Sequence, residues 1–126
     1  MDDQEKQAVR RATGGTAEDL AAAEYEKAGA RIVARNHRLK CGELDLVVEE
    51  TDGSEIVLVF VEVRARSELA SWETPAESLT PSKLRKLRNA ASSYLASYRG
   101  AATSVRFDLA SWNLQTMQIH KNFWWY

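Results

Sequence analysis

The chain has few of the residues that build disulfide-linked or zinc-binding domains. It holds a single cysteine, Cys41, in 126 residues, which excludes an internal disulfide and a cysteine-rich zinc site. Its two histidines, His37 and His120, are isolated in the sequence, and we expect each to be a surface residue of a strand. One thiol fits a reducing compartment, so the expected location is the cytoplasm.

Long apolar runs and an excess of one charge are also missing. The longest uninterrupted apolar run, residues 56–61, is far too short to cross a bilayer, and residues 1–15 contain no apolar core of the signal-peptide kind. We therefore expect no membrane contact. The 17 basic and 18 acidic residues nearly cancel, so no overall basic field attracts nucleic acid. Any nucleic-acid site must be a local patch.

The chain does contain enough apolar sequence for one globular domain. With 44% apolar and 28% charged residues over 126 positions, it has an ordinary composition for a soluble protein that buries a core. Residues 1–15 are polar and end in two glycines, which predicts a flexible segment. Residues 16–126 are expected to form a single domain.

Seven elements are predicted in the order α-β-β-β-α-β-β. Helices are expected over residues 16–29 and 80–100, each closed by a glycine, and Thr80 and Pro81 are a cap and a first-turn residue for the second. Strands are expected over residues 30–39, 42–50, 55–66, 104–112 and 114–126, with a turn near Asn113 and a loop over 67–78. An Asp-Gly turn signal joins the second and third strands into an antiparallel hairpin. This order indicates an α/β fold with a central mixed sheet and flanking helices.

The two hairpin strands carry ionisable residues among apolar ones, which is costly unless the charges are paired or bind a ligand. Two-residue turns that start at position 52 or 53 pair Asp45 with Phe60 or with Glu62, respectively. Because side chains alternate between the faces of a sheet, either register places Asp45, Glu62 and Arg64 on one face, as direct or diagonal neighbours. The hairpin therefore predicts two carboxylates close together.

Two neighbouring carboxylates repel each other unless they share a proton, a basic partner or a hard cation. Asp45 and Glu62, with waters, would form a Mg²⁺ or Mn²⁺ site, and the ion would polarise a phosphodiester and activate bound water. The alternative is a salt-bridged sheet in which Arg64 pairs with Glu62 or Asp45, and Arg66 pairs with Glu43. The pattern by itself leaves both alternatives open.

Several ordered blocks of the sequence carry a family resemblance. They read TAEDLAAAEYEKAG, RIVARNHR, GELDLVV, FVEVRAR, TPSKLRKLRNAASSYL and RFDLA. Together, over about residues 15–120, they resemble the YraN family of small bacterial proteins, which is similar to the PD-(D/E)xK nuclease superfamily and close to archaeal Holliday-junction resolvases. The resemblance implies a restriction-endonuclease-like fold. It also implies an endonuclease that uses Mg²⁺ or Mn²⁺ to hydrolyse phosphodiester bonds, with structure-selective cleavage of DNA as one form of that activity.

The resemblance assigns roles to four residues. By position, the superfamily's catalytic set of helix acid, hairpin aspartate and (D/E)-x-K pair corresponds to Glu18, Asp45, Glu62 and Arg64, of which the three acids would hold the metal. Glu18 also suits the first turn of a helix without any metal, because a carboxylate interacts favourably with the helix dipole there. Arg64 stands where the motif has lysine, and arginine stays charged and cannot serve as a base. The first alternative to an active endonuclease is therefore a catalytically inactive module that binds nucleic acid.

The second predicted helix carries a dense basic run without a balancing acid. Its members are Lys83, Arg85, Lys86 and Arg88. Most such runs are solvated helix faces, but the density also suits phosphate groups, so we expect these residues to bind nucleic acid. The aromatic C-terminus, residues 122–126, is expected to pack on the core or to form a homodimer contact. If the strand acids only form ordinary ion pairs, the aromatic tail would be an interface. The second alternative to an endonuclease is therefore a protein-interaction scaffold.

Overall fold

The computed structural model describes residues 16–65, 74 and 77–123. The elements follow the predicted order α-β-β-β-α-β-β. They are α2 (Thr16–Lys27), β1 (Arg31–Leu39), β2 (Gly42–Asp52), β3 (Glu55–Ala65), α3 (Pro81–Ser97), β4 (Ser104–Trp112) and β5 (Met117–His120). The segment expected to be flexible, residues 1–15, and most of the expected loop over 67–78 lie outside the described residues. No helix in the described ranges is both long and apolar enough to cross a membrane.

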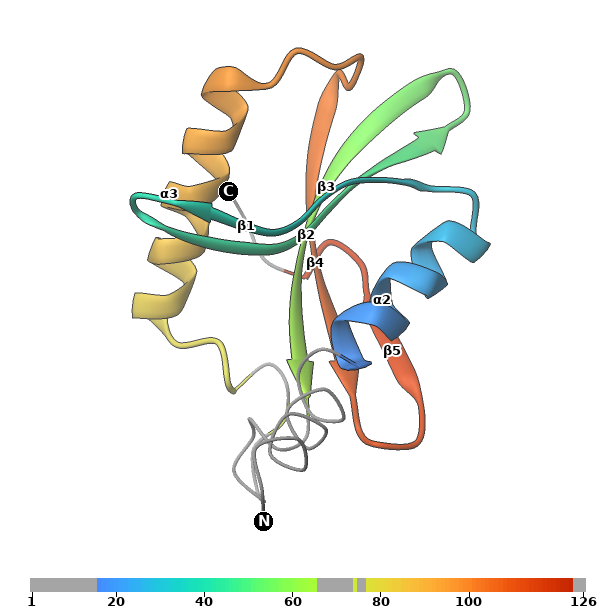
Figure 1. Cartoon of the computed structure of the whole chain (residues 1–126), viewed down its shortest axis with the longest axis vertical. Helices are drawn as coiled ribbons and strands as arrows, with labels where there is room; N and C mark the ends of the chain where they lie inside the picture. The colour runs from blue at the N-terminus through green and yellow to red at the C-terminus, as the bar shows by residue number, and fades with distance from the viewer. Residues whose placement is uncertain (1–15, 66–73, 75–76, 124–126) are drawn as a thin grey trace, which may run out of the picture.

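The five strands form one mixed sheet in the order β1-β2-β3-β4-β5. Strands β3 and β4 are parallel, and the other neighbouring pairs are antiparallel. Because parallel neighbours need a crossover connection, α3 links β3 to β4 across one face of the sheet, while α2 covers the other face (Figure 1). This architecture confirms the predicted α/β class and is consistent with a restriction-endonuclease-like fold.

Each face of the sheet has its own hydrophobic cluster. On the α2 side, Ala21 and Tyr25 belong to the cluster that includes Val59 of the central strand. On the α3 side, Leu87 belongs to the cluster that includes Phe60. Strand β3 is therefore buried on both faces, which explains why its sequence is an almost continuous apolar run rather than an alternating one.

The sequence signals at two helix ends are confirmed. Thr80 caps α3, since its hydroxyl accepts the backbone amide of Lys83 at 3.3 Å, and Pro81 is the first helical residue. Gly29 has a positive φ of 94° after the last residue of α2. The amides of Gly29 and Ala30 reach back to carbonyls of the last turn, each at 2.9 Å, as in a glycine-closed helix end.

The predicted end of α3 at Gly100 is wrong. The helix ends at Ser97, because Tyr98 is already extended, with φ −67° and ψ 132°. From this position the Tyr98 hydroxyl reaches Glu49 of β2 at 3.2 Å. The helix therefore ends before the glycine, at a residue whose side chain makes a tertiary contact with β2.

The predicted extent of the last strand is also wrong. Strand β5 covers Met117–His120 rather than residues 114–126. The Asn113 side chain accepts the backbone amides of residues 115 and 116 at 2.9 and 2.8 Å, which holds this stretch in a turn. After β5, the amide of Phe123 donates to the carbonyl of Phe107 at 2.7 Å, and the Phe123 ring packs on the α3-side cluster. Residues 124–126 lie outside the described residues, and a homodimer contact stays a prediction.

The β1–β2 ribbon changes faces halfway along its length. Leu44 belongs to the α3-side cluster, whereas Leu46 belongs to the α2-side cluster. Residues two apart in a regular strand share a face, so the strand must twist at Asp45. Opposite this point, Asn36 of β1 has a positive φ of 48°, a conformation uncommon outside glycine. One part of the ribbon therefore lies against α2 and the other against α3 (Figure 1).

Candidate functional site

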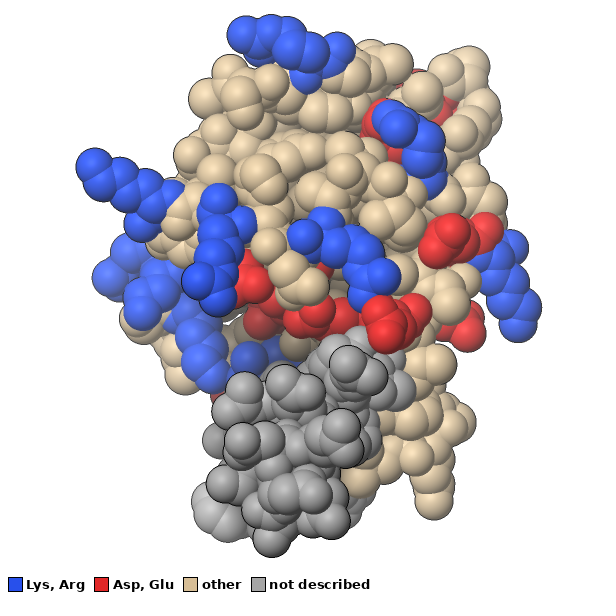
Figure 2. Space-filling model, viewed as in Figure 1, with Lys and Arg blue, Asp and Glu red and all other residues tan. Residues whose placement is uncertain are grey.

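A pocket of about 270 Å³ opens between β2, β3 and the N-terminal part of α3. Its lining combines three acidic and three basic residues with Gly42 and Leu87. The charged members are Glu43, Asp45, Glu62, Arg64, Lys83 and Lys86. In Figure 2, acidic side chains gather at the centre of the face that carries the β1–β2 ribbon, with basic side chains around them. Three of the four residues predicted to be catalytic, and two of the four predicted to bind nucleic acid, thus meet in one pocket.

Asp45 reaches this pocket from the twist in β2. Backbone pairing between β2 and β3 runs from Asp52 opposite Glu55 to Leu46 opposite Val61, which is the register that aligns Asp45 with Glu62. Beyond that ladder, the Asp45 carboxylate accepts the backbone amide of Val63 at 2.9 Å. The structure therefore brings Asp45 and Glu62 together as the second of the two predicted registers requires. Their role in catalysis stays a prediction.

Arg64 is held at the inner wall of the pocket. Its Nη1 lies 3.7 Å from Glu62 Oε1, and its Nε donates to the Ser78 hydroxyl at 3.2 Å. The side chains of Arg64 and Glu62 are each only 13% exposed. The predicted ion pair between Arg64 and Glu62 is therefore present, and it places a permanent positive charge beside one of the two acids.

Glu43 lies next to an arginine of β1. Its carboxylate lies 4.0 Å from Nε of Arg38, an exposed residue on β1. The predicted partner, Arg66, lies outside the described residues. Both side chains of the observed pair are open to water, and an exposed pair of this length contributes little to stability.

Glu18 approaches the acids of the hairpin from α2. Burial raises the pKa of Glu18, and the nearby Asp45 carboxylate raises it further, with a smaller effect of Glu43. A hydrogen bond with the Asn36 side chain opposes these effects. Burial is the larger cause, and the contribution of Asp45 places its carboxylate within electrostatic reach of Glu18. Glu18 is nevertheless not a lining residue of the pocket.

The acids of the site suit a metal ion that keeps several water ligands better than one held by protein ligands alone. Within the described ranges, no three acidic, histidine or cysteine side chains gather closely enough to hold a metal between them. Mg²⁺ commonly binds through one or two carboxylates and takes its other ligands from water and substrate phosphates. Asp45 and Glu62, on one pocket, fit that donor set. A contact of Glu18 with the ion stays a prediction.

The four basic residues of α3 do not share one face. Lys83 and Lys86 line the pocket, together with Leu87. Arg85 and Arg88 are not among its lining residues, and at 100° per residue they fall on the opposite side of the helix. Lys83 is fixed further, because its Nζ donates to the carbonyl of Ser78 at 3.2 Å. The predicted basic patch thus separates into a pair directed at the acids and a pair directed away from them.

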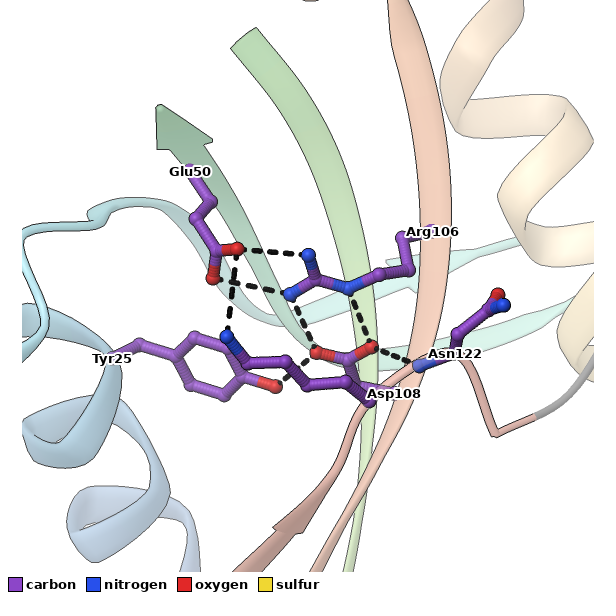
Figure 3. A network of polar contacts seen from close by, with 6 residues as sticks. Tyr25, Glu50, Arg106, Asp108 and Asn122 are labelled. Atoms are coloured by element: carbon purple, nitrogen blue, oxygen red, sulfur yellow. Dashed lines mark hydrogen bonds and ion pairs between the residues drawn. The ribbon is translucent and has the colours of Figure 1, made fainter. Parts of the chain in front are cut away.

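A second polar cluster, which was not predicted, lies on the α2 side of the sheet (Figure 3). At its centre is Asp108 of β4, whose side chain is completely buried. It accepts hydrogen bonds from the Tyr25 hydroxyl at 2.6 Å, from Arg106 Nε at 2.9 Å and Nη2 at 3.0 Å, and from the backbone amide of Asn122 at 2.9 Å. Four donors around one carboxylate explain how a charged group is tolerated there.

Arg106 joins this cluster to β2. Its guanidinium makes two hydrogen bonds to Glu50, at 2.8 and 3.1 Å, and Lys121 Nζ lies 3.7 Å from the same carboxylate. The hydrogen bond from Arg106 lowers the pKa of Glu50. Burial, and next the charge of Asp108, raise the pKa of Tyr25, which stays a neutral donor. Two acids and two bases balance, so the cluster links α2, β2, β4 and the segment after β5 as a structural unit.

The chain is similar to proteins from several organisms. The sequence profile of the family described as "Uncharacterised protein family UPF0102" matches residues 17–111. A UPF0102 protein of Ralstonia nicotianae is 43% identical over 100 residues, which cover 78% of this chain and 75% of that protein. A UPF0102 protein of Pelotomaculum thermopropionicum is 43% identical over 101 residues, 80% of each chain. One from Symbiobacterium thermophilum is 45% identical over 96 residues, 75% of this chain and 77% of that protein. The chain therefore belongs to the UPF0102 family, which is the YraN family that its sequence blocks resemble.

Proposed function

We propose that this chain is a cytoplasmic nucleic-acid-binding protein and an endonuclease that hydrolyses phosphodiester bonds with Mg²⁺ or Mn²⁺. DNA is the proposed nucleic acid, and branched or otherwise structured DNA is the proposed form. The observation that carries the proposal is the meeting of Asp45 and Glu62 with Arg64, Lys83 and Lys86 in one pocket. Carboxylates suit a hard cation, and the basic side chains suit phosphate oxygens.

The charges of the pocket favour joint binding of a metal ion and a phosphodiester. The three acidic and three basic lining residues cancel, so the empty lining carries no net charge to attract a polyanion. Asp45 and Glu62 would hold a divalent ion, with Glu18 near enough to act on it through water, and the bound ion would polarise a phosphodiester and activate water. The pocket would then carry an excess of positive charge, and nucleic-acid binding should depend on the divalent ion.

Arg64 has a defined part in this proposal. Because Glu62 and Ser78 hold its guanidinium, it supplies a fixed positive charge beside the metal-binding acids. It orients Glu62 and stabilises negative charge on a phosphate that enters the pocket. It does not remove a proton from water, because a guanidinium stays protonated.

The experiment is a divalent-ion titration followed by a cleavage panel. Mg²⁺ and Mn²⁺ binding is measured by calorimetry on the wild-type chain, on Asp45→Ala and on Glu62→Ala. The panel contains branched, flapped, duplex and single-stranded DNA and single-stranded RNA. Cleavage by the wild-type chain that both variants lose supports the proposal. Absence of divalent-ion binding together with absence of cleavage on every substrate rejects the enzyme.

A second function, nucleic-acid binding without cleavage, is favoured by one observation. The motif lysine is replaced by Arg64, which is already engaged with Glu62. Under this alternative, wild type binds DNA in the presence of the ion and leaves it intact, whereas Arg64→Lys cleaves it. Cleavage by wild type removes the alternative, and so does a lysine variant that binds normally and stays inactive.

A further inference from the structure

Ser78 connects two positively charged residues that come from different parts of the chain. Its side chain and backbone are 3% exposed, and it lies just before the cap of α3. Its hydroxyl accepts Nε of Arg64 from β3 at 3.2 Å, and its carbonyl accepts Nζ of Lys83 from α3 at 3.2 Å. One buried residue therefore holds both cations at the same wall of the pocket.

The two cations differ in how much freedom they retain. Arg64 is 13% exposed and is held by both Glu62 and Ser78, so its charge is fixed close to the sheet. Lys83 is exposed, and its flexible stem carries a compact ammonium with three donors. The contact with Ser78 uses one donor, which fixes the direction of the ammonium and leaves two for an oxygen ligand.

We infer that Lys83, directed by Ser78, is the cation that contacts the phosphate under attack, the task that the nuclease motif gives to the lysine replaced here by Arg64. Arg64 keeps the part described above, since it orients Glu62 and adds a fixed positive charge at the wall of the pocket. The inference rests on the proposed function. It places the lysine that contacts the phosphate on α3, whereas the nuclease motif has its lysine at the position of Arg64 on β3. Asp45 and Glu62 would hold the divalent ion, and the Lys83 ammonium would supply a donor to a phosphate that enters the same pocket.

Helix geometry provides a matched control for this inference. Arg85 carries the same charge as Lys83 two residues later on α3, is also exposed to solvent, and lies about 200° away around the helix. Removing either charge has a similar effect on the long-range attraction of a polyanion. Only removal of Lys83 takes a donor from the pocket.

The test compares Lys83→Gln with Arg85→Gln in the full chain. Binding of a fluorescent DNA oligonucleotide is measured by anisotropy with Ca²⁺, and single-turnover cleavage is measured with Mn²⁺ at saturating protein. For Lys83→Gln we expect the rate at saturation to fall about 100-fold or more, the usual effect of removing one donor to transition-state charge. For Arg85→Gln we expect weaker binding and a rate within about threefold of wild type, because a long-range charge acts mainly on association. Mn²⁺ affinity should not fall in either variant, because neither residue is proposed to hold the ion.

The outcomes separate this inference from the proposed function. A wild-type chain that binds neither the divalent ion nor DNA rejects the proposed function and the inference with it. A wild-type chain that cleaves DNA, with Lys83→Gln and Arg85→Gln equally active, overturns the inference alone. Should wild type bind without cleaving, the binding comparison decides. A loss of affinity at least fivefold larger for Lys83→Gln than for Arg85→Gln supports the inference, and any smaller difference overturns it.

Discussion

The carboxylate of Asp45 accepts a hydrogen bond from the backbone amide of Val63 at 2.9 Å. The bond joins β2 to β3 just past the last backbone pair, Leu46 opposite Val61, where the β1–β2 ribbon turns from one face of the sheet to the other. Asp45 therefore has a structural contact as well as a place on the pocket. The structural contact needs an oxygen that accepts the Val63 amide, and the proposed binding of a metal ion needs the negative charge.

Asp45→Asn should separate these two roles. Asparagine keeps an oxygen that can accept the Val63 amide, so the free energy of unfolding should change by less than about 1 kcal/mol. Divalent-ion affinity should fall about tenfold or more, because affinity for hard cations follows the charge of the ligands. Calorimetry and urea denaturation measure both quantities. Glu55→Gln, at an exposed position next to the hairpin turn, is the control and should bind the ion as wild type does. Unchanged affinity in Asp45→Asn contradicts the metal site.

Glu18→Gln should change stability in a pH-dependent way. Burial and the Asp45 charge raise the pKa of Glu18 above 4.5, so its ionised form is less favourable in the folded than in the unfolded chain. The stabilising contribution of Glu18 is fully present below its unfolded pKa and is lost as the pH rises through the higher folded pKa. We therefore expect Glu18→Gln to exceed wild type in stability at pH 7 and to lose this advantage below about pH 4.

Urea denaturation at several pH values measures this effect, with Glu24→Gln, an exposed position on the same helix, as the control. Saturating Mn²⁺ should reduce the difference at pH 7, because a bound cation relieves the repulsion between Glu18 and Asp45. A Glu18→Gln chain that is less stable than wild type at pH 7 contradicts the described electrostatics.

Strand periodicity was sufficient to predict the neighbours Asp45 and Glu62, because a short hairpin turn constrains the register to a few possibilities. It was not sufficient for the twist that turns Leu44 and Leu46 to different faces. That twist coincides with a positive φ at Asn36. The backbone conformation of a single non-glycine residue cannot be predicted from the spacing of apolar residues. The nearness of Asp45 and Glu62 could therefore be predicted, but not the way in which Asp45 enters the pocket.

The basic run on α3 illustrates a signal that was available. Periodicity of 3.6 residues separates Lys83 and Lys86 from Arg85 and Arg88, and the structure places only the first pair at the pocket. The link from Ser78 to Lys83 could not be predicted, since it depends on how the segment before α3 meets the sheet. Spacing thus identifies which side chains share a face, whereas their partners depend on tertiary packing.

Asp108→Asn should be strongly destabilising. The buried carboxylate accepts four hydrogen bonds, two of them from Arg106, and an amide side chain has one oxygen and no charge to offer. Loss of one partner from a buried ion pair costs about 3–5 kcal/mol, so we expect a loss of that size in the free energy of unfolding. Lys121→Gln, at the exposed end of the same cluster, should cost about 1 kcal/mol or less. Thermal and urea denaturation measure both, and equal effects would contradict the central place of Asp108.

Gly100→Ala should destabilise the chain through Tyr98. A β-carbon at position 100 would overlap the Tyr98 hydroxyl oxygen and the ring carbon that bears it, so the ring must move. That hydroxyl donates to Glu49 at 3.2 Å and accepts the backbone amide of Ala102 at 3.1 Å, and both bonds weaken when the ring shifts. We expect a loss of about 1–3 kcal/mol in the free energy of unfolding, as for other overpacked sites.

A double-mutant cycle identifies the cause of that loss. In a Tyr98→Ala background the obstructing ring is gone, so Gly100→Ala should cost much less there than in the wild-type chain. Equal costs in the two backgrounds would place the effect in the backbone at position 100 rather than in the ring contact. Divalent-ion affinity should be the same in all four chains, because Tyr98 follows the last residue of α3, whereas the pocket that holds Asp45 and Glu62 lies at the other end of the helix. A change in that affinity would instead show that the two ends of α3 are coupled.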